Sequence, residues 1–70
     1  MITNELIADG YGGNIVVTTD EQPETTSVVL TYNGQVKRKK FRGETSHHDA
    51  QRWVNDNTIP IIHAGRKTLL

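Results

Sequence analysis

Three histidines, His47, His48 and His63, are the side chains best suited to metal chemistry in this sequence. A zinc site needs nitrogen, sulfur or carboxylate ligands that converge on one ion at about 2 Å. His47 and His48 are neighbours in a predicted helix, where successive side chains point about 100° apart, so they do not easily share an ion. The chain has no cysteine, and therefore no thiolate ligand and no disulfide. We expect neither a bound metal nor a cofactor.

No other set of residues specifies a catalytic reaction. The spacing defines no Ser-His-Asp arrangement, and we expect no paired carboxylates near an apolar pocket. A chain of 70 residues buries only about 60% of its unfolded surface, which leaves little core to support an active site. We therefore expect a non-enzymatic domain, for which forming a homodimer would bury additional surface.

Charge is distributed unevenly along the chain. Residues 1–36 carry five acidic and no basic residues, whereas residues 37–70 carry all eight basic residues and three acidic ones. Such asymmetry favours an oriented electrostatic surface, often one for a polyanion. The alternative is that the two halves neutralise each other across the fold.

The basic run is the most informative feature of the sequence. Five basic residues fall within six positions: Lys37, Arg38, Lys39, Lys40 and Arg42. Charge concentrated in this way neutralises phosphates and releases counterions, so the run predicts contact with nucleic acid, with Arg52, Arg66 and Lys67 as flanking phosphate contacts. Charged strands also prevent edge-to-edge aggregation, so a solvated face or a surface for a protein partner is the competing interpretation.

The basic run forms the second arm of a predicted β-hairpin. Residues 28–32 are rich in β-branched, aromatic and apolar side chains, and Asn33-Gly34 is a strong signal for a two-residue type I′ turn. That turn places Leu30 opposite Lys37 and Val28 opposite Lys39. A three-residue loop would instead move every basic side chain to the other face of the sheet. We favour the two-residue turn.

The remaining elements indicate an α+β domain with the order β-β-β-α-β. Residues 1–13 are expected to be a loosely ordered arm, broken by glycines, and residues 14–70 a single domain. Residues 14–20 predict a first strand, and residues 58–64 a fourth, in which Pro60 suits an edge. The expected sheet is antiparallel with one helix packed across one face.

The helix is predicted to open at Thr45 or Ser46, where Ser46-His47-His48-Asp49 has the spacing of a capping box. Its core-facing stripe follows the i, i+3, i+4, i+7 pattern and consists of Ala50, Trp53, Val54 and Asn57. We expect Asn57 to end the helix in a left-handed conformation.

Residues 29–54 resemble the arm-type DNA-binding domain of tyrosine-family integrases, a three-stranded sheet plus one helix. The matching features are the turn Tyr32-Asn33-Gly34, the basic strand that ends in Phe41, and a short helix with Trp53. The resemblance implies that the sheet enters the major groove of double-stranded DNA with the basic strand at or near the DNA.

Residues 50–67 are similar to the recognition helix and wing of excisionase-like winged helices, where a helix with a tryptophan precedes an Ile-Pro step and a basic wing. Both resemblances imply a small phage- or plasmid-type accessory protein that binds nucleic acid. No apolar run reaches membrane-spanning length and the start of the chain lacks the pattern of a signal peptide, so we expect a cytoplasmic protein.

The rival hypothesis is an inhibitor or adaptor that binds a host protein, such as a nucleic-acid-processing enzyme. It would use its acidic half, with Asp20, Glu21 and Glu24, as a DNA mimic, or add a strand edge to its partner.

Overall fold

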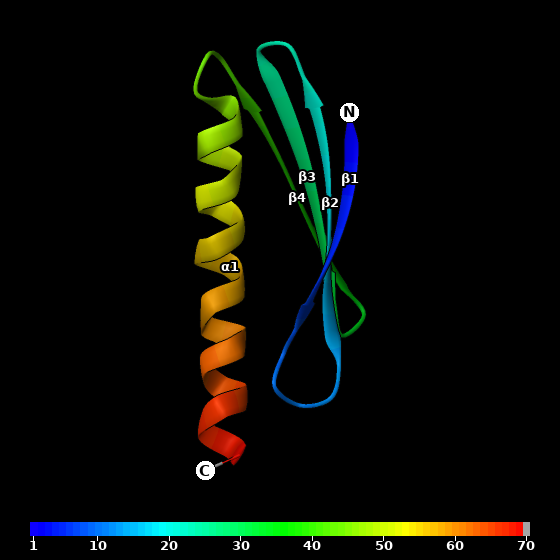
Figure 1. Cartoon of the computed structure of the whole chain (residues 1–70), viewed down its shortest axis with the longest axis vertical. Helices are drawn as coiled ribbons and strands as arrows, with labels where there is room; N and C mark the ends of the chain where they lie inside the picture. The colour runs from blue at the N-terminus through cyan, green and yellow to red at the C-terminus, as the bar shows by residue number, and fades with distance from the viewer. Residues whose placement is uncertain (70) are drawn as a thin grey trace.

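The structure, a computed structural model, describes the backbone of residues 1–69 and the side chains of residues 1–63. It is an α+β fold in which one antiparallel sheet of four strands is covered on one face by one helix (Figure 1). The elements are β1 (Ile2–Ala8), β2 (Asn14–Gln22), β3 (Thr25–Tyr32), β4 (Gln35–Arg42) and α1 (Ser46–Leu69). The strands follow one another in the order β1-β2-β3-β4, so β1 and β4 are the two edges.

The hairpin of β3 and β4 confirms the predicted two-residue turn. Asn33 and Gly34 both have positive φ, 52° and 80°, as a type I′ turn requires. The register places Leu30 opposite Lys37 and Val28 opposite Lys39. This register decides which basic side chains face α1 and which face away from it.

The order of elements differs from the expected β-β-β-α-β at both ends. Residues 2–8, expected to belong to a loosely ordered arm, form β1, which pairs with β2 from Ile2↔Asp20 to Ala8↔Asn14. Residues 58–64, expected to form a fourth strand, instead continue α1. The prediction of a helix end at Asn57 is therefore wrong, and the observed order is β-β-β-β-α.

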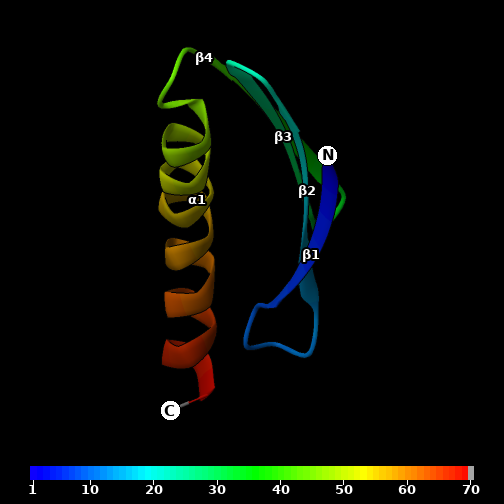
Figure 2. The same ribbon diagram turned by 45° about the horizontal axis from the view of Figure 1, so that its top comes forward.

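The core lies between the helix and the covered face of the sheet. Among the described side chains, the buried apolar residues are Ile15, Val17, Val28, Leu30, Ala50 and Val54. Trp53 and Phe41 are partly buried against this cluster, which fits the role expected for the tryptophan. Figure 2 shows the sheet curving alongside the helix while its other face stays uncovered.

The helix continues past residue 57 because its buried stripe continues. Ala50, Val54 and Thr58 are buried at spacings of four, and Ile61 packs against the core one turn later. Packing on this face outweighs the strand preference of the β-branched side chains. Pro60 cannot donate to the carbonyl four residues earlier. In the preceding turn, the Asn57 side chain donates to the Trp53 carbonyl at 2.8 Å.

The start of the helix is joined to the sheet. The Thr45 hydroxyl donates to the Asp49 carboxylate at 3.0 Å, so Thr45, rather than Ser46, pairs with the acid of the first turn. Ser46 is buried, and its hydroxyl lies 3.1 Å from the hydroxyl of Thr26 on β3. The first turn of α1 is therefore held over β3 by a buried polar contact.

Asp9 organises the loop between β1 and β2. One of its carboxylate oxygens accepts hydrogen bonds from the backbone N–H groups of Tyr11 and Gly13, at 2.7 and 3.0 Å. The other accepts from the Tyr32 hydroxyl at 2.6 Å. A Cβ atom on Gly13 would lie 2.8 Å from this second oxygen, so the closely packed loop requires glycine there. Residues 9–13, expected to be loose, are thus pinned to the end of β3.

The Asp9–Tyr32 hydrogen bond lowers the pKa of Asp9 and raises the pKa of Tyr32. The bond from Tyr32, together with the backbone N–H groups, lowers the pKa of Asp9 below its ordinary value of 3.8. The same bond, and burial, raise the pKa of Tyr32 above 10.0. The ionised carboxylate and the neutral phenol are the forms that the fold stabilises.

Replacing Leu30 by Ala should lower the free energy of unfolding by about 2 to 5 kcal/mol, because it leaves a cavity in a small core. That is a large share of the roughly 4 to 10 kcal/mol expected for a chain of this length. Urea unfolding followed by Trp53 fluorescence measures the loss. Val36→Ala, on the uncovered face and 51% exposed, is the control and should change stability by less than about 0.5 kcal/mol. Equal losses in the two variants would contradict the assignment of the core face.

Asp9→Asn should destabilise the protein at pH 7, where the wild-type carboxylate is ionised. Because the folded-state pKa lies below the ordinary value of 3.8, the contribution of Asp9 is complete above that value. It is lost as the pH falls through the folded-state pKa, so the stability difference between wild type and variant should shrink in acid. Urea titrations at neutral and acidic pH test this, with Asp56→Asn on the exposed side of α1 as the control. A difference that does not change with pH would contradict it.

Candidate nucleic-acid interface

The five cations of β4 separate into two groups on opposite faces of the sheet. Lys37 and Lys39 lie opposite buried Leu30 and Val28, so they belong to the face that α1 covers. Successive strand residues point to opposite faces. The other three cations, Arg38, Lys40 and Arg42, therefore stand on the uncovered face.

The uncovered group forms a straight row along the edge of the sheet, which we call the open-face row (Arg38, Lys40 and Arg42). All three residues are exposed. Their spacing of two residues is about 6.8 Å, so the row is about 14 Å long. They lie opposite Val29, Ser27 and Thr25 of β3, respectively. These short side chains leave the longer cationic ones projecting from the sheet.

The open-face row has no acidic partner among the described side chains. Among the described residues, ion pairs join the amino group of Met1 to Asp20 and His47 to Glu21, both at 3.9 Å. Asp20 shares the uncovered face but lies two strands from Lys40, and its carboxylate also accepts from Gln22 at 2.9 Å. Unpaired cations on a solvated strand are available to an external anion.

The two cations on the covered face have different surroundings. The Lys37 ammonium donates to the Asn57 side chain at 3.3 Å, which links β4 to α1. Lys37 also lines a groove of about 360 Å³ between the hairpin end and the helix, with Asp56 on its helical wall. Lys39 is exposed at the sheet edge. These lysines are therefore separated from the open-face row by the sheet itself.

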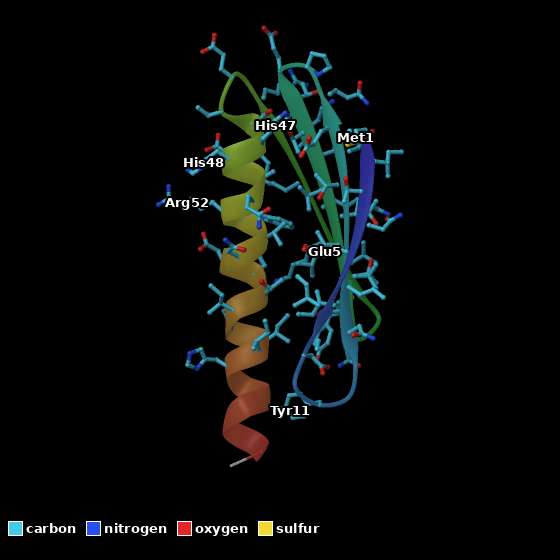
Figure 3. All side chains as sticks on the ribbon, in the orientation of Figure 1. Met1, Glu5, Tyr11, His47, His48 and Arg52 are labelled. Atoms are coloured by element: carbon cyan, nitrogen blue, oxygen red, sulfur yellow. The ribbon has the colours of Figure 1, made fainter. Side chains whose placement is uncertain are left out.

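Arg52 does not join the open-face row either. It lies on the exposed side of α1, and Figure 3 shows it pointing away from the sheet, as does His48. It lines a hollow of about 270 Å³ together with Asp49 and Asp56, whose carboxylates reduce its local positive potential. The other two predicted flanking contacts, Arg66 and Lys67, lie in the helical backbone of α1, but their side chains are outside the described residues.

The acidic residues lie mainly towards the other edge of the sheet. Glu5 on β1 and Glu21 on β2 line a cleft of about 150 Å³ against α1. His47 closes one side of this cleft: its Nδ1 lies 2.7 Å from the Thr26 hydroxyl, and its Nε2 faces Glu21. In the described part of the chain, no three His, Asp or Glu side chains come together as a metal site.

Strand alternation alone divides the basic run between two faces, whichever register the hairpin adopts. The register, which the Asn-Gly turn indicated, decides which of the two groups faces the core. The separation of Arg52 had a weaker signal, its place opposite the apolar stripe of the helix. The acidic cleft was missed, because its β1 wall was not predicted to be a strand.

The comparisons with known proteins leave the class of protein open. No family model matches the chain, and neither the curated proteins nor the solved structures contain a match. In the described part of the chain, no helix is long and apolar enough to cross a membrane. The function must therefore be argued from the geometry and charge of the open-face row.

Proposed function

We propose that this protein is a non-enzymatic nucleic-acid-binding protein that contacts double-stranded DNA through the open-face row. The observation that carries the proposal is the alignment of Arg38, Lys40 and Arg42 on the uncovered face of an edge strand, without an acidic partner among the described side chains. Each cation that neutralises a phosphate releases a condensed counterion, which is the main source of sequence-independent affinity.

The dimensions of the row suit a duplex. Its length of about 14 Å corresponds to roughly four phosphates of one strand, at 3.4 Å of axial rise each. A two-stranded ribbon such as β3–β4 also fits the width of the major groove, about 12 Å. Because α1 covers the opposite face, the helix does not stand between the row and the DNA (Figure 2).

The guanidinium and ammonium groups of the row are suited to phosphates. Its β3 neighbours are Val29, Ser27 and Thr25, which are too short to reach base edges past the arginines. We therefore propose binding that depends strongly on salt and weakly on sequence. The resemblance to integrase arm domains supports the same use of a basic strand, and a phage- or plasmid-type accessory role in the cytoplasm belongs to this proposal.

The test is a titration of a short duplex DNA at increasing salt concentrations. Changing Arg38, Lys40 and Arg42 to Gln should remove most of the binding at low salt. The slope of log K against log salt should become shallower by about 2.7, which is 0.9 for each of three phosphate contacts. The wild-type circular dichroism spectrum should be retained, because all three side chains are exposed.

Two matched variants control for the loss of charge. Arg52→Gln, on the outer side of α1, and the pair Lys37→Gln with Lys39→Gln, on the covered face, should each leave most of the salt slope intact. Unchanged affinity in the folded open-face variant would refute the proposal, as would an equal loss in the Arg52 variant.

A protein partner is the second candidate, and it is favoured by one observation. Asp20, Glu21 and Glu24 fall within five positions at the end of β2 and in the turn to β3, with Asp20 on the uncovered face of the sheet and Glu21 facing α1. Exposed carboxylates in this arrangement suit a basic surface on a host protein, as a DNA mimic would. Capture of one host protein that persists after nuclease treatment, and disappears when these three residues are made neutral, would favour this candidate.

A further inference from the structure

We propose that β1 is a self-association edge, at which two copies of this chain pair their β1 strands antiparallel about a two-fold axis at Asn4. The two four-stranded sheets would then form one continuous sheet of eight strands. The inference does not depend on nucleic-acid binding, because it concerns the opposite edge of the sheet from the open-face row.

The backbone groups of β1 point alternately towards β2 and towards the open edge. The Met1 amino group donates to the Glu21 carbonyl at 2.7 Å, and the Glu21 N–H donates to the Met1 carbonyl at 2.8 Å. Residues in an antiparallel pair alternate between hydrogen-bonded and non-bonded positions. The N–H and C=O groups of Ile2, Asn4 and Leu6 therefore point away from β2, towards the open edge.

The two edge strands of the sheet differ in their charge and in how far α1 covers them. Natural sheets protect exposed edges with charges, proline, bulges or a covering element. β4 carries five cations in its eight residues, whereas β1 carries a single charge, that of Glu5, and no proline. The helix packs mainly on β3 and β4, and Figures 1 and 2 place β1 at the side of the sheet away from it. β1 is therefore the less protected of the two edges.

Exposed apolar side chains lie beside the β1 edge. Ile2 and Leu6 are 67% and 69% exposed, although both lie in a regular strand. Their side chains lie on the uncovered face, in register with Asp20 and Val16. A second strand paired to β1 would cover the flank of both side chains.

The residues of β1 are complementary to β1 itself, so we infer that the strand added at this edge is β1 of a second copy. Pairing outward-facing backbone groups requires Ile2, Asn4 or Leu6 to oppose another of these positions. With Asn4 opposite Asn4 of the second copy, Ile2 lies opposite Leu6 and Thr3 opposite Glu5. Ile2, Asn4 and Leu6 then form hydrogen-bonded pairs, and apolar side chains meet on the uncovered face.

The neighbouring registers are worse. A shift by two residues in one direction places Glu5 directly opposite Glu5 of the second copy, which is repulsive. A shift in the other direction, with Thr3 at the axis, leaves Leu6 without an apolar partner. The strand is therefore most complementary to itself when Asn4 lies on the two-fold axis.

The register leads to a charge-swap test at Asn4. Sedimentation velocity of the protein without nucleic acid, from about 1 μM to 1 mM, should show a reversible monomer–dimer equilibrium, as expected for a small interface. Asn4→Asp and Asn4→Lys should each remain monomeric, because like charges then meet at the axis. An equimolar mixture of the two variants should recover the dimer.

Asn55→Asp, on the exposed side of α1, is the matched control and should dimerise like the wild type. Circular dichroism confirms folding, and the Thr18 hydroxyl, which donates to Asn4 at 2.9 Å, can donate equally to an aspartate. A wild-type protein that stays monomeric throughout, or a dimer that persists in both Asn4 variants, would overturn the proposal. Growth beyond a dimer would also overturn it, because pairing of β1 with β4 of another copy is open-ended.

The outcome is distinguishable from a failure of the proposed function. The open-face variant should dimerise normally, and the Asn4 variants should retain salt-dependent DNA binding as monomers. A common loss of both properties in either variant would contradict the separation of the two edges.

Discussion

The whole structure depends on covering one face of a single-layer sheet with one helix. Six apolar side chains account for the fully buried apolar core of the described residues, and all of them lie between α1 and the β2–β3 centre of the sheet. A chain of this size cannot cover the second face as well. The uncovered face is therefore a consequence of chain length, and the open-face row lies on it.

Because only one face of the sheet is covered, the basic run is divided between a covered and an uncovered face, which the linear sequence does not show directly. In the linear chain, five cations within six positions resemble one cluster. In the sheet, the alternation of side chains divides them, and the buried Val28 and Leu30 decide which of them face the helix. Lys37 becomes a link between β4 and α1, whereas Arg38, Lys40 and Arg42 remain directed to solvent. The electrostatic character of the surface thus follows from hydrophobic packing on the other side.

The sequence was most informative where a local rule acts alone. Asn33-Gly34 specified the turn and register of the hairpin because few residues tolerate positive φ at two successive positions. It misled where tertiary packing competes with local preference: residues 58–64 have strand-forming side chains, yet Thr58 and Ile61 continue the buried stripe of α1. β1 was missed because several of its residues, among them Asn4, Glu5 and Ala8, have low strand propensity, so that pairing with β2 and not local preference makes it a strand. The open-face row was derivable once the register was chosen, whereas the acidic cleft was not.

The hydrogen bond between Asp9 and Tyr32 has a consequence for how the protein opens. It joins the loop that connects β1 to β2 with the last residue of β3, beside the turn into β4. The two hairpins of the meander are thus fastened together at the same end of the sheet, across 23 positions of sequence. Fraying of β1, which would otherwise be a local event at an edge, must release a residue that also lines the helix–sheet groove. The sheet is therefore expected to exchange its amide hydrogens as one cooperative unit at this end.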